Sequence, residues 1–165
     1  MFDSFRTEAF RLETLDDYSR SGNVDAYQSF LDGQPKPDDY NADWLDEIRS
    51  HTSAGRRVYR VHVLARPLTP YLRFELGWGY LTNATAGEEF FILDTTERPN
   101  PLPDAGDFWL FDSTTPAPMT YTHDGRFVSA HVLPDGHAVE QYVAARDAAL
   151  AQAVPFADWW SKYGE

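Results

Sequence analysis

Two runs of strand-forming residues enclose residues 66–87, and this arrangement constrains the fold more than any other feature of the sequence. In "RRVYRVHVLA" (56–65), polar and apolar residues alternate and β-branched residues are frequent, as in a strand. "EEFFILD" (88–94) is a compact apolar run, typical of a strand that is buried on both faces. Two parallel strands in one sheet need a long connection, which is usually a helix. The sequence therefore predicts a strand–helix–strand unit.

The segment "TPYLRFELGWGYLTNATAGE" (69–88), which lies between these strands, fits two different structures. Its apolar residues alternate from Leu72 onward, which is typical of a strand. It also begins like a helix, because Thr69 is a favourable N-cap and Pro70 suits the first helical turn. The two glycines in its middle count against a helix by about 1 kcal/mol each relative to alanine. The flanking strands favour the helix, and we predict it over residues 69–82.

The remaining segments complete a single domain of the mixed α/β class. Short helices are predicted before the first strand, and "DFWLFD" is predicted to be a strand after a proline-rich loop. The dipeptide Asp124-Gly125 predicts a tight hairpin with a type I′ turn. We expect one domain over residues 1–165, with a helical N-terminal part (1–55), a mixed sheet with the crossover helix and the hairpin (56–133), and two C-terminal helices (135–163).

The charge of the chain restricts its partners. Lys plus Arg number 14 and Asp plus Glu number 26, so the formal net charge is −12. This charge opposes direct binding to nucleic acids and to anionic membranes, because such binding draws its affinity from basic patches. It favours a positively charged protein partner. The N-terminus shows no apolar signal-peptide core and the chain has no cysteine, so we expect a cytoplasmic protein.

The sequence lacks the motifs of common catalytic and cofactor sites. Its five histidines show no paired metal-ligand spacing. "GWGYLT" begins like a dinucleotide-binding loop, but Thr82 occupies the position of the third glycine. We therefore expect no metal, no cofactor and no catalytic residue. The chain is more consistent with a binding protein than with an enzyme.

Six stretches that span nearly the whole chain carry a family resemblance. They are "AFRLET", "NADWL", "RRVYRVHVLARPLTPYLRFELGWGYLTNATAGE", "DFWLFD", "DGRF" and "QYVAARDAALAQAVPFADW". Together they resemble an uncharacterised family of small actinobacterial proteins, a domain of unknown function. Members of that family are often encoded beside helix-turn-helix regulators, so the resemblance implies such a regulator as a partner. It implies no activity and no catalytic residue.

The order of the predicted elements is also similar to one half of a phospholipase D-like domain. Such enzymes carry a His-x-Lys motif with an Asp five residues after the Lys. Asp112 matches that Asp, but Ala105 and Asp107 occupy the positions of the His and the Lys. The nucleophile and the phosphate-binding cation are both missing. The likeness therefore implies the fold without the activity.

Polar and aromatic residues are predicted to gather where the parallel strands end. Ligands of α/β sheets bind beyond the carboxyl ends of the strands. The residues expected around this edge are Arg66, Tyr71, Arg73, Glu75, Asp107 and Trp109. They define a candidate cleft for a small polar ligand, and the alternative is an ordinary ion pair above core aromatic residues.

The sequence supports two functional hypotheses. The first is a non-catalytic regulatory protein that binds a protein partner, such as a helix-turn-helix regulator. The alternative is a small-ligand sensor, or an enzyme that acts on phosphoesters or nucleotides, with a cleft around Arg73, Glu75, Asp107 and Trp109. The sequence leaves the partner, the ligand and the oligomeric state open.

Overall fold

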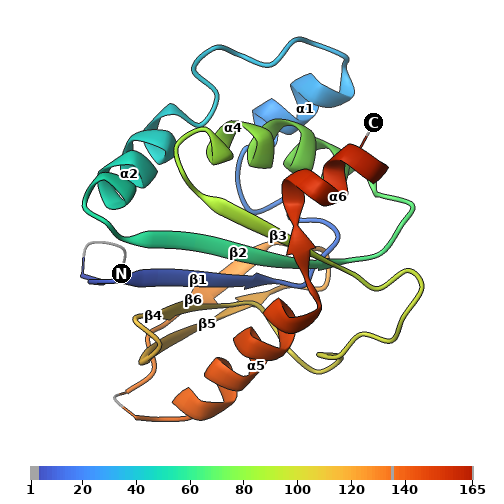
Figure 1. Cartoon of the computed structure of the whole chain (residues 1–165). Helices are drawn as coiled ribbons and strands as arrows, with labels where there is room; N and C mark the ends of the chain where they lie inside the picture. Colours follow the sequence, from blue (N-terminus) through green and yellow to red (C-terminus); the bar gives the residue numbers. More distant parts are fainter. Residues whose placement is uncertain (1–3, 135, 165) are drawn as a thin grey trace.

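The computed structural model describes residues 4–134 and 136–164, which form one sheet with helices on both faces (Figure 1). The strands are β1 (Glu8–Glu13), β2 (Arg57–Leu64), β3 (Glu89–Asp94), β4 (Phe108–Phe111), β5 (Thr115–Tyr121), β6 (Phe127–Ala130) and β7 (Val154–Pro155). The helices are α1 (Val24–Leu31), α2 (Ala42–Ser53), α3 (Pro70–Phe74), the π-helix η1 (Glu75–Tyr80), α4 (Leu81–Ala84), α5 (Val139–Gln152) and α6 (Phe156–Tyr163).

The sheet is mixed, as predicted from the sequence. Its strand order is β6-β5-β4-β1-β2-β3-β7. β1 and β3 pair with β2 in parallel, and the other pairs are antiparallel. Helices α1 to α4 and α6 cover the face that is uppermost in Figure 1, and α5 covers the lower face. In the described part of the chain, no helix is long and apolar enough to cross a membrane.

The crossover between β2 and β3 is helical, which confirms the prediction. The helices α3, η1 and α4 follow one another without a break from Pro70 to Ala84. The Thr69 side chain caps the first turn, because its hydroxyl oxygen accepts a hydrogen bond from the backbone N–H of Leu72 at 3.1 Å. The sequence did not indicate that the middle turns are π-helical. Such wide turns inside α-helices are frequent at functional sites.

The N-terminal part differs from the helical segment that was predicted for residues 1–55. Helices α1 and α2 are present, but β1 lies between β2 and β4 at the centre of the sheet. Polar residues at Glu8, Arg11 and Glu13 hide the strand in the sequence. The two C-terminal helices are confirmed, with the short strand β7 between them. Asp135, where that predicted region begins, lies outside the described residues.

β5 and β6 form the predicted hairpin, but its turn is not type I′. That turn requires positive φ at both central residues. Gly125 has a φ of 79°, whereas Asp124 has no positive φ. The backbone N–H of Gly125 donates to the carbonyl oxygen of Thr122 at 3.0 Å, and Thr122 N–H donates to the carbonyl oxygen of Arg126 at 2.8 Å. The connection is therefore the longer loop in which a single left-handed glycine closes the turn.

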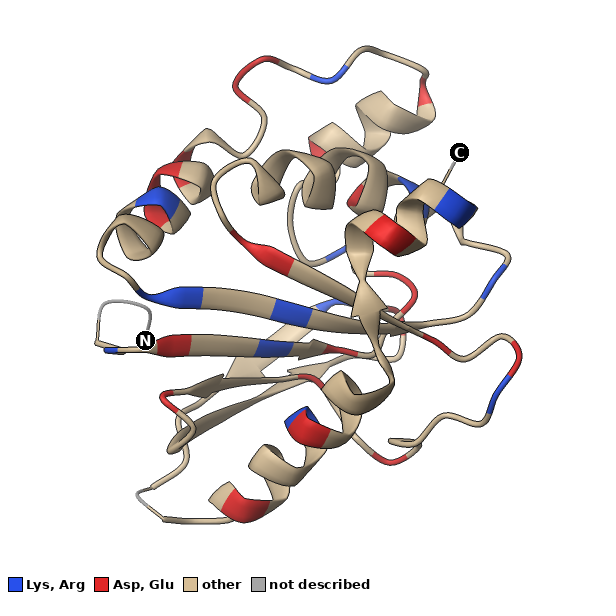
Figure 2. Cartoon of the chain, viewed as in Figure 1, with Lys and Arg blue, Asp and Glu red and all other residues tan. Residues whose placement is uncertain are grey.

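The two faces of the sheet differ in polarity. The lower face is apolar, and α5 packs on the buried side chains of Phe10 and Tyr59, among others. The upper face carries Arg11 and Glu13 of β1 and the paired Arg60 and His62 of β2. Figure 2 shows the basic positions near the middle of these two strands. The helical layer therefore covers a charged surface of the sheet.

Candidate functional site

A cavity of about 500 Å³ lies between the upper face of the sheet and the helices above it. This volume is in the range of pockets that hold small organic molecules. We call it the inner cavity. Its lining residues are Asn23, Tyr40, Asn41, Trp44, Arg60, Tyr71, Phe74, Glu75, Gly79, Tyr80, Asn83 and Trp109.

Two buried arginines form ion pairs beneath the inner cavity. Arg11 Nη2 lies 2.9 Å from Asp107 Oδ2. Arg60 Nε lies 2.5 Å from Glu88 Oε1, and Arg60 Nη1 lies 3.0 Å from Glu13 Oε1. The most exposed of these five side chains, Arg60, is only 15% exposed. Because these ions have lost most of their hydration, removal of one partner leaves an uncompensated buried charge.

Asp107 connects β4 to the end of β1. Besides the Arg11 guanidinium, its carboxylate accepts hydrogen bonds from the Tyr18 hydroxyl at 2.6 Å and the Thr14 hydroxyl at 2.7 Å. The backbone N–H of Thr14 also donates to it at 2.9 Å. These donors occupy both carboxylate oxygens, so Asp107 connects Arg11, Thr14 and Tyr18 beneath the cavity.

The Tyr80 hydroxyl lies between Glu13 and His62. The His62 Nε2 atom lies 2.9 Å from the carbonyl oxygen of Leu15, and since a carbonyl can only accept, Nε2 carries a proton. The Tyr80 hydroxyl donates to Glu13 Oε2 at 2.5 Å, and its oxygen lies 3.1 Å from His62 Nδ1. Burial opposes ionisation of Glu13, but Arg60 and Arg11 outweigh it and lower the pKa of Glu13 to about 2. Glu13 is therefore a fixed anion.

Glu75, on η1, has the opposite electrostatic environment. Burial, followed by the charge of Glu13, raises the pKa of Glu75 well above its usual value. Among residues 4–134 and 136–164, no group forms a hydrogen bond with Glu75 Oε2, and His62 Nδ1 is 3.4 Å away. The neutral acid is therefore favoured at the edge of the cavity. Two nearby carboxyl groups with separated pKa values are typical of sites that bind or exchange protons.

Aromatic rings form the walls of the inner cavity. Tyr71 and Phe74 of α3 lie on one side, with their ring centroids 5.9 Å apart. Trp44 and Trp109 also line the cavity, and the Arg60 guanidinium is 5.6 Å and 5.4 Å from the centroids of their rings. These rings present π faces, which attract cations. The arrangement suits a ligand with an apolar body and a charged or hydrogen-bonding end directed at Glu75.

A divalent metal ion fits poorly between Glu13, His62 and Glu75. Glu13, His62 and Glu75 offer ligand atoms within 4.8 Å of one another. The two oxygens of Glu13, however, accept hydrogen bonds from Tyr80 and Arg60. The Arg11 Nε atom lies only 3.8 Å from the same carboxylate. Two guanidinium groups at this distance oppose a divalent cation through Coulomb repulsion.

The six residues of the predicted cleft do not lie at one place. Tyr71, Glu75 and Trp109 line the inner cavity together. Asp107 lies beneath it as the partner of Arg11. The other two, Arg66 and Arg73, lie elsewhere.

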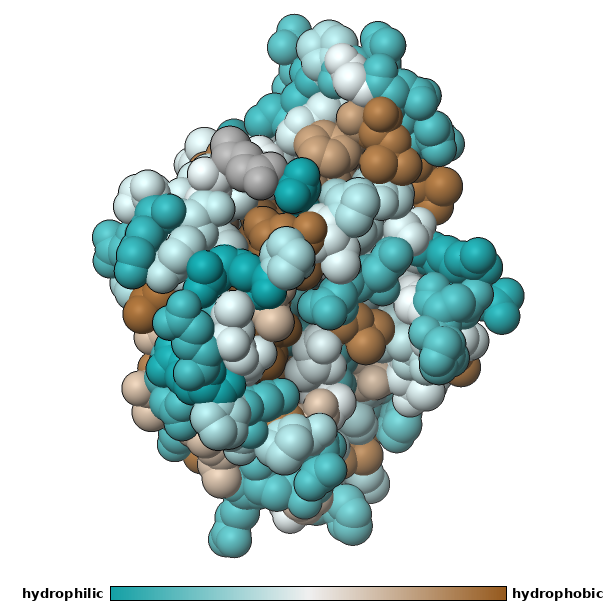
Figure 3. Space-filling view, turned by 90° about the vertical axis from the view of Figure 1, so that its right-hand side faces the viewer, coloured by the Kyte–Doolittle hydropathy of each residue, from teal (hydrophilic) through white to brown (hydrophobic). Residues whose placement is uncertain are grey.

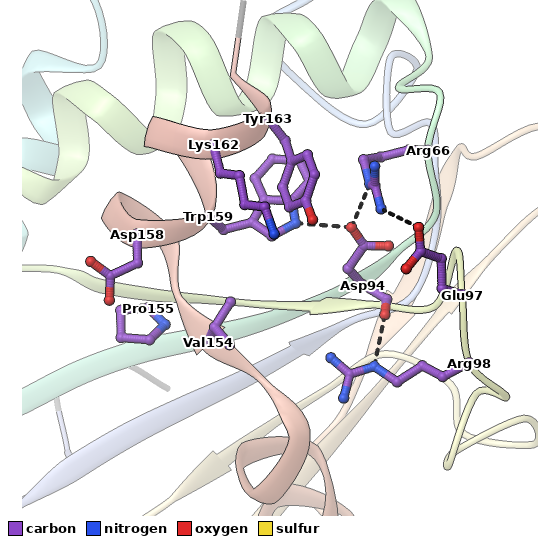
Figure 4. A pocket seen from close by; sticks show the side chains of 10 residues that line it. All are labelled: Arg66, Asp94, Glu97, Arg98, Val154, Pro155, Asp158, Trp159, Lys162 and Tyr163. Carbon is purple, nitrogen blue, oxygen red and sulfur yellow. Dashed lines mark hydrogen bonds and ion pairs between the residues drawn. The ribbon is translucent and has the colours of Figure 1, made fainter.

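Arg73 lines a separate hollow with Gly77, Trp78 and Leu81. Arg66 lines a cavity beyond the carboxyl ends of β2 and β3 (Figure 4).

The sequence reasoning missed the charged groups of the central strands, which are Arg11, Glu13, Arg60 and His62. A signal for them was present in the sequence. Arg11 and Glu13 are two residues apart on β1, and Arg60 and His62 are two residues apart on β2. Residues at this spacing lie on the same face of a sheet. What the sequence did not reveal is that this face is buried.

Comparison with known proteins gives one family. A family model described as "Domain of unknown function (DUF6879)" matches residues 1–161. No curated protein and no solved structure matches the chain.

Proposed function

Because the chain belongs to this family of unknown function, we propose its function from the inner cavity: the protein is a non-catalytic sensor that binds a small organic cation. One observation carries the proposal. Glu75 is a carboxyl group at the cavity whose Oε2 atom has no hydrogen-bond partner among the described residues. A buried carboxyl group with an atom that lacks a partner is costly, so a ligand that donates a hydrogen bond to the Glu75 carboxyl group from the cavity side gains affinity.

The charge of the buried network supports a cation rather than an anion. Arg11 and Arg60 contribute +2, and Glu13, Glu88 and Asp107 contribute −3, so these five side chains sum to 2 − 3 = −1, with Glu75 and His62 counted as neutral. An ammonium group beside Glu75 offsets this charge and stabilises the ionised form of Glu75. The aromatic walls add cation–π attraction of about 0.5–2 kcal/mol.

A thermal-shift series with ligands of equal size tests this proposal. Benzylammonium, benzyl alcohol and benzoate share one ring and differ in charge. We expect benzylammonium to raise the melting temperature in a saturable way and the other two to leave it unchanged. Glu75→Gln should abolish the shift, whereas Glu140→Gln, on the exposed start of α5, should preserve it. A shift that is equal for all three compounds, or that survives Glu75→Gln, would contradict the proposal.

Regulatory protein binding is a second candidate function, favoured by the edge strand β6. Within the described residues this strand pairs with β5 alone, and it exposes Phe127 and Val128. An open edge with apolar side chains can accept a strand from a partner. The net charge of −12 favours a basic partner such as a helix-turn-helix regulator, and disfavours direct nucleic-acid binding. The face shown in Figure 3 is mainly hydrophilic and has small separated apolar patches. It therefore offers no extended apolar surface for a protein partner. We place both roles in the cytoplasm.

Co-elution of the purified chain with a helix-turn-helix regulator encoded beside a family member tests this second candidate. We expect a complex at low salt that weakens as the salt concentration rises. Val128→Lys should disrupt it, whereas Leu81→Lys, an equally apolar exposed position on α4, should not. A complex that is unaffected by Val128→Lys would exclude the β6 edge as the binding surface.

A further inference from the structure

A second cavity of about 550 Å³ lies beyond the carboxyl ends of the parallel strands β2 and β3. It is formed by the loops that follow β2 and β3, by β7 and by α6 (Figure 4). The carboxyl ends of parallel strands are where α/β sheets bind ligands. Its lining residues are Arg66, Asp94, Glu97, Arg98, Val154, Pro155, Asp158, Trp159, Lys162 and Tyr163. None of them lines the inner cavity.

Arg66 is held in a fixed orientation at this cavity. Its Nε atom donates to Asp94 Oδ2 at 2.7 Å, and its guanidinium carbon lies 3.9 Å from the centroid of the Tyr163 ring. Trp159 Nε1 donates to the same Asp94 oxygen at 3.0 Å. Burial opposes ionisation of Asp94, but hydrogen bonds from Thr96, Trp159 and Arg66 outweigh it and lower the pKa of Asp94 to about 2. Asp94 therefore acts as a fixed anchor, and Arg66 loses little side-chain freedom when a ligand binds.

Arg98 and Lys162 also line this cavity, and among residues 4–134 and 136–164 neither forms an ion pair with a carboxylate within 4 Å. Arg98 Nε donates to the backbone carbonyl oxygen of Asp94 at 3.0 Å. Lys162 Nζ lies 4.8 Å from the centroid of the Tyr163 ring. In Figure 4 the ends of both side chains point toward the middle of the cavity, where Val154 forms part of the floor.

The carboxylates at this cavity do not block its centre. Glu97 is 3.9 Å from Arg66 Nη2, but its side chain is 86% exposed. In Figure 4 the Asp158 carboxylate points away from Arg98 and Lys162. Asp94 also lines the cavity, but its carboxylate is paired with Arg66 at 2.7 Å, so Arg98 and Lys162 supply the positive charge that a ligand meets there.

We infer that this second cavity binds a small phosphate monoester, with its phosphate between Arg66, Arg98 and Lys162 and its apolar body on Val154 and Pro155. A phosphate group has three terminal oxygens, which match several donors at once, and guanidinium groups bind it in a bidentate manner. The concave apolar wall gives affinity to the organic part. The inference does not depend on the inner cavity, because the two cavities share no lining residue.

Isothermal titration with phenyl phosphate tests the inference, since this compound combines a phosphate with a flat apolar body. We expect saturable binding that is weaker for inorganic phosphate and for benzoate. The double variant Arg98→Ala/Lys162→Ala should weaken binding of phenyl phosphate by about tenfold or more, because charge-assisted hydrogen bonds are lost. Arg49→Ala removes an exposed basic side chain of α2 and should leave the affinity unchanged.

Three results would overturn the inference. They are the absence of saturable binding of phenyl phosphate at millimolar concentration, equal affinity for benzoate, and full affinity in the double variant. Arg98 and Lys162 lie at the surface, so the double variant and the wild type should have the same denaturant midpoint of unfolding. If the midpoints differ, each single variant is titrated separately and the same outcomes apply.

Discussion

Glu13 and Glu75 lie next to each other in the buried network, yet replacement of each by glutamine is expected to have very different effects. The carboxylate of Glu13 accepts hydrogen bonds from Arg60 and Tyr80, so Glu13→Gln removes a charge on which Arg60 depends. Glu75 is favoured in its neutral form, and an amide resembles a neutral acid in shape. Glu75→Gln therefore changes the charge of the folded protein less than Glu13→Gln does.

The magnitudes follow from the pKa of each group. The pKa of Glu13 falls from 4.5 to about 2, which corresponds to about 3 kcal/mol of stability at neutral pH. Mutational data on broken buried ion pairs give about 3–5 kcal/mol. We therefore expect Glu13→Gln to destabilise the fold by about 3 kcal/mol. For Glu75→Gln we expect about 1 kcal/mol or less at pH 5, which is the effect of one altered hydrogen bond.

The two groups also produce opposite pH dependences. The pKa of Glu13 is lowered on folding, so its contribution is present above pH 4.5 and is lost as the pH falls toward 2. The pKa of Glu75 is raised on folding, so its contribution is complete below its unfolded pKa of about 4.3 and is lost as the pH rises through the raised value. Between the unfolded pKa and the raised folded pKa of Glu75, the wild type should lose stability relative to Glu75→Gln by up to about 1.4 kcal/mol per pH unit.

Urea unfolding at pH 5, 6, 7 and 8, followed by tryptophan fluorescence, measures both effects. The Glu140→Gln variant serves as the control for loss of a surface carboxylate. A stability difference between the wild type and Glu75→Gln that does not change with pH would refute the neutral Glu75. A cost below about 1 kcal/mol for Glu13→Gln would refute the role of Glu13 as the anion on which Arg60 depends.

Three further substitutions test the fold around the site. Gly125→Ala should destabilise the protein strongly, because φ is 79° and an added Cβ would clash with the Asp17 carbonyl oxygen; Gly136→Ala, with φ of 73° and no described atom within 4 Å of the added Cβ, is the matched control in urea unfolding. Thr69→Ala should cost about 1 kcal/mol in the same assay, because it removes the cap of the crossover helix. Asp107→Ala should cost about 3–5 kcal/mol, because Arg11 loses its closest carboxylate; a loss below 1 kcal/mol would show that water replaces that partner.

Local patterns in the sequence were sufficient to predict the β2–helix–β3 unit. Both strands have strong residue preferences, and Thr69 with Pro70 marks the helix start. β1 was missed because its burial depends on partners distant in the sequence, such as Arg11 with Asp107, which are 96 residues apart. Periodicity reports the local environment of a strand and carries no information about such pairs.

The sequence brought together only some of the residues of the candidate site, because their positions also depend on the tertiary structure. Tyr71, Glu75 and Trp109 do line one cavity. Arg73 does not, because two residues along a helix correspond to a rotation of about 200°, which turns it away from Glu75. Arg66 lies beyond the end of β2, outside the layer that the helix covers. The predicted residues are therefore divided between a cavity above the face of the sheet and a second cavity beyond the carboxyl ends of β2 and β3.

The buried ions themselves argue for function over stability. Burial of an ion pair costs hydration energy that its mutual attraction often fails to recover, and apolar residues of similar volume are often equally stabilising. A combined Arg11→Met/Asp107→Leu variant should therefore retain much more stability than Asp107→Ala. The remaining Arg60, Glu13 and Glu88 still sum to 1 − 2 = −1, so a variant that folds but loses benzylammonium binding would show that Arg11 and Asp107 position the groups around Glu75. Retention of both stability and binding would assign Arg11 and Asp107 to the scaffold alone, and would leave Glu75 and the aromatic walls as the functional part.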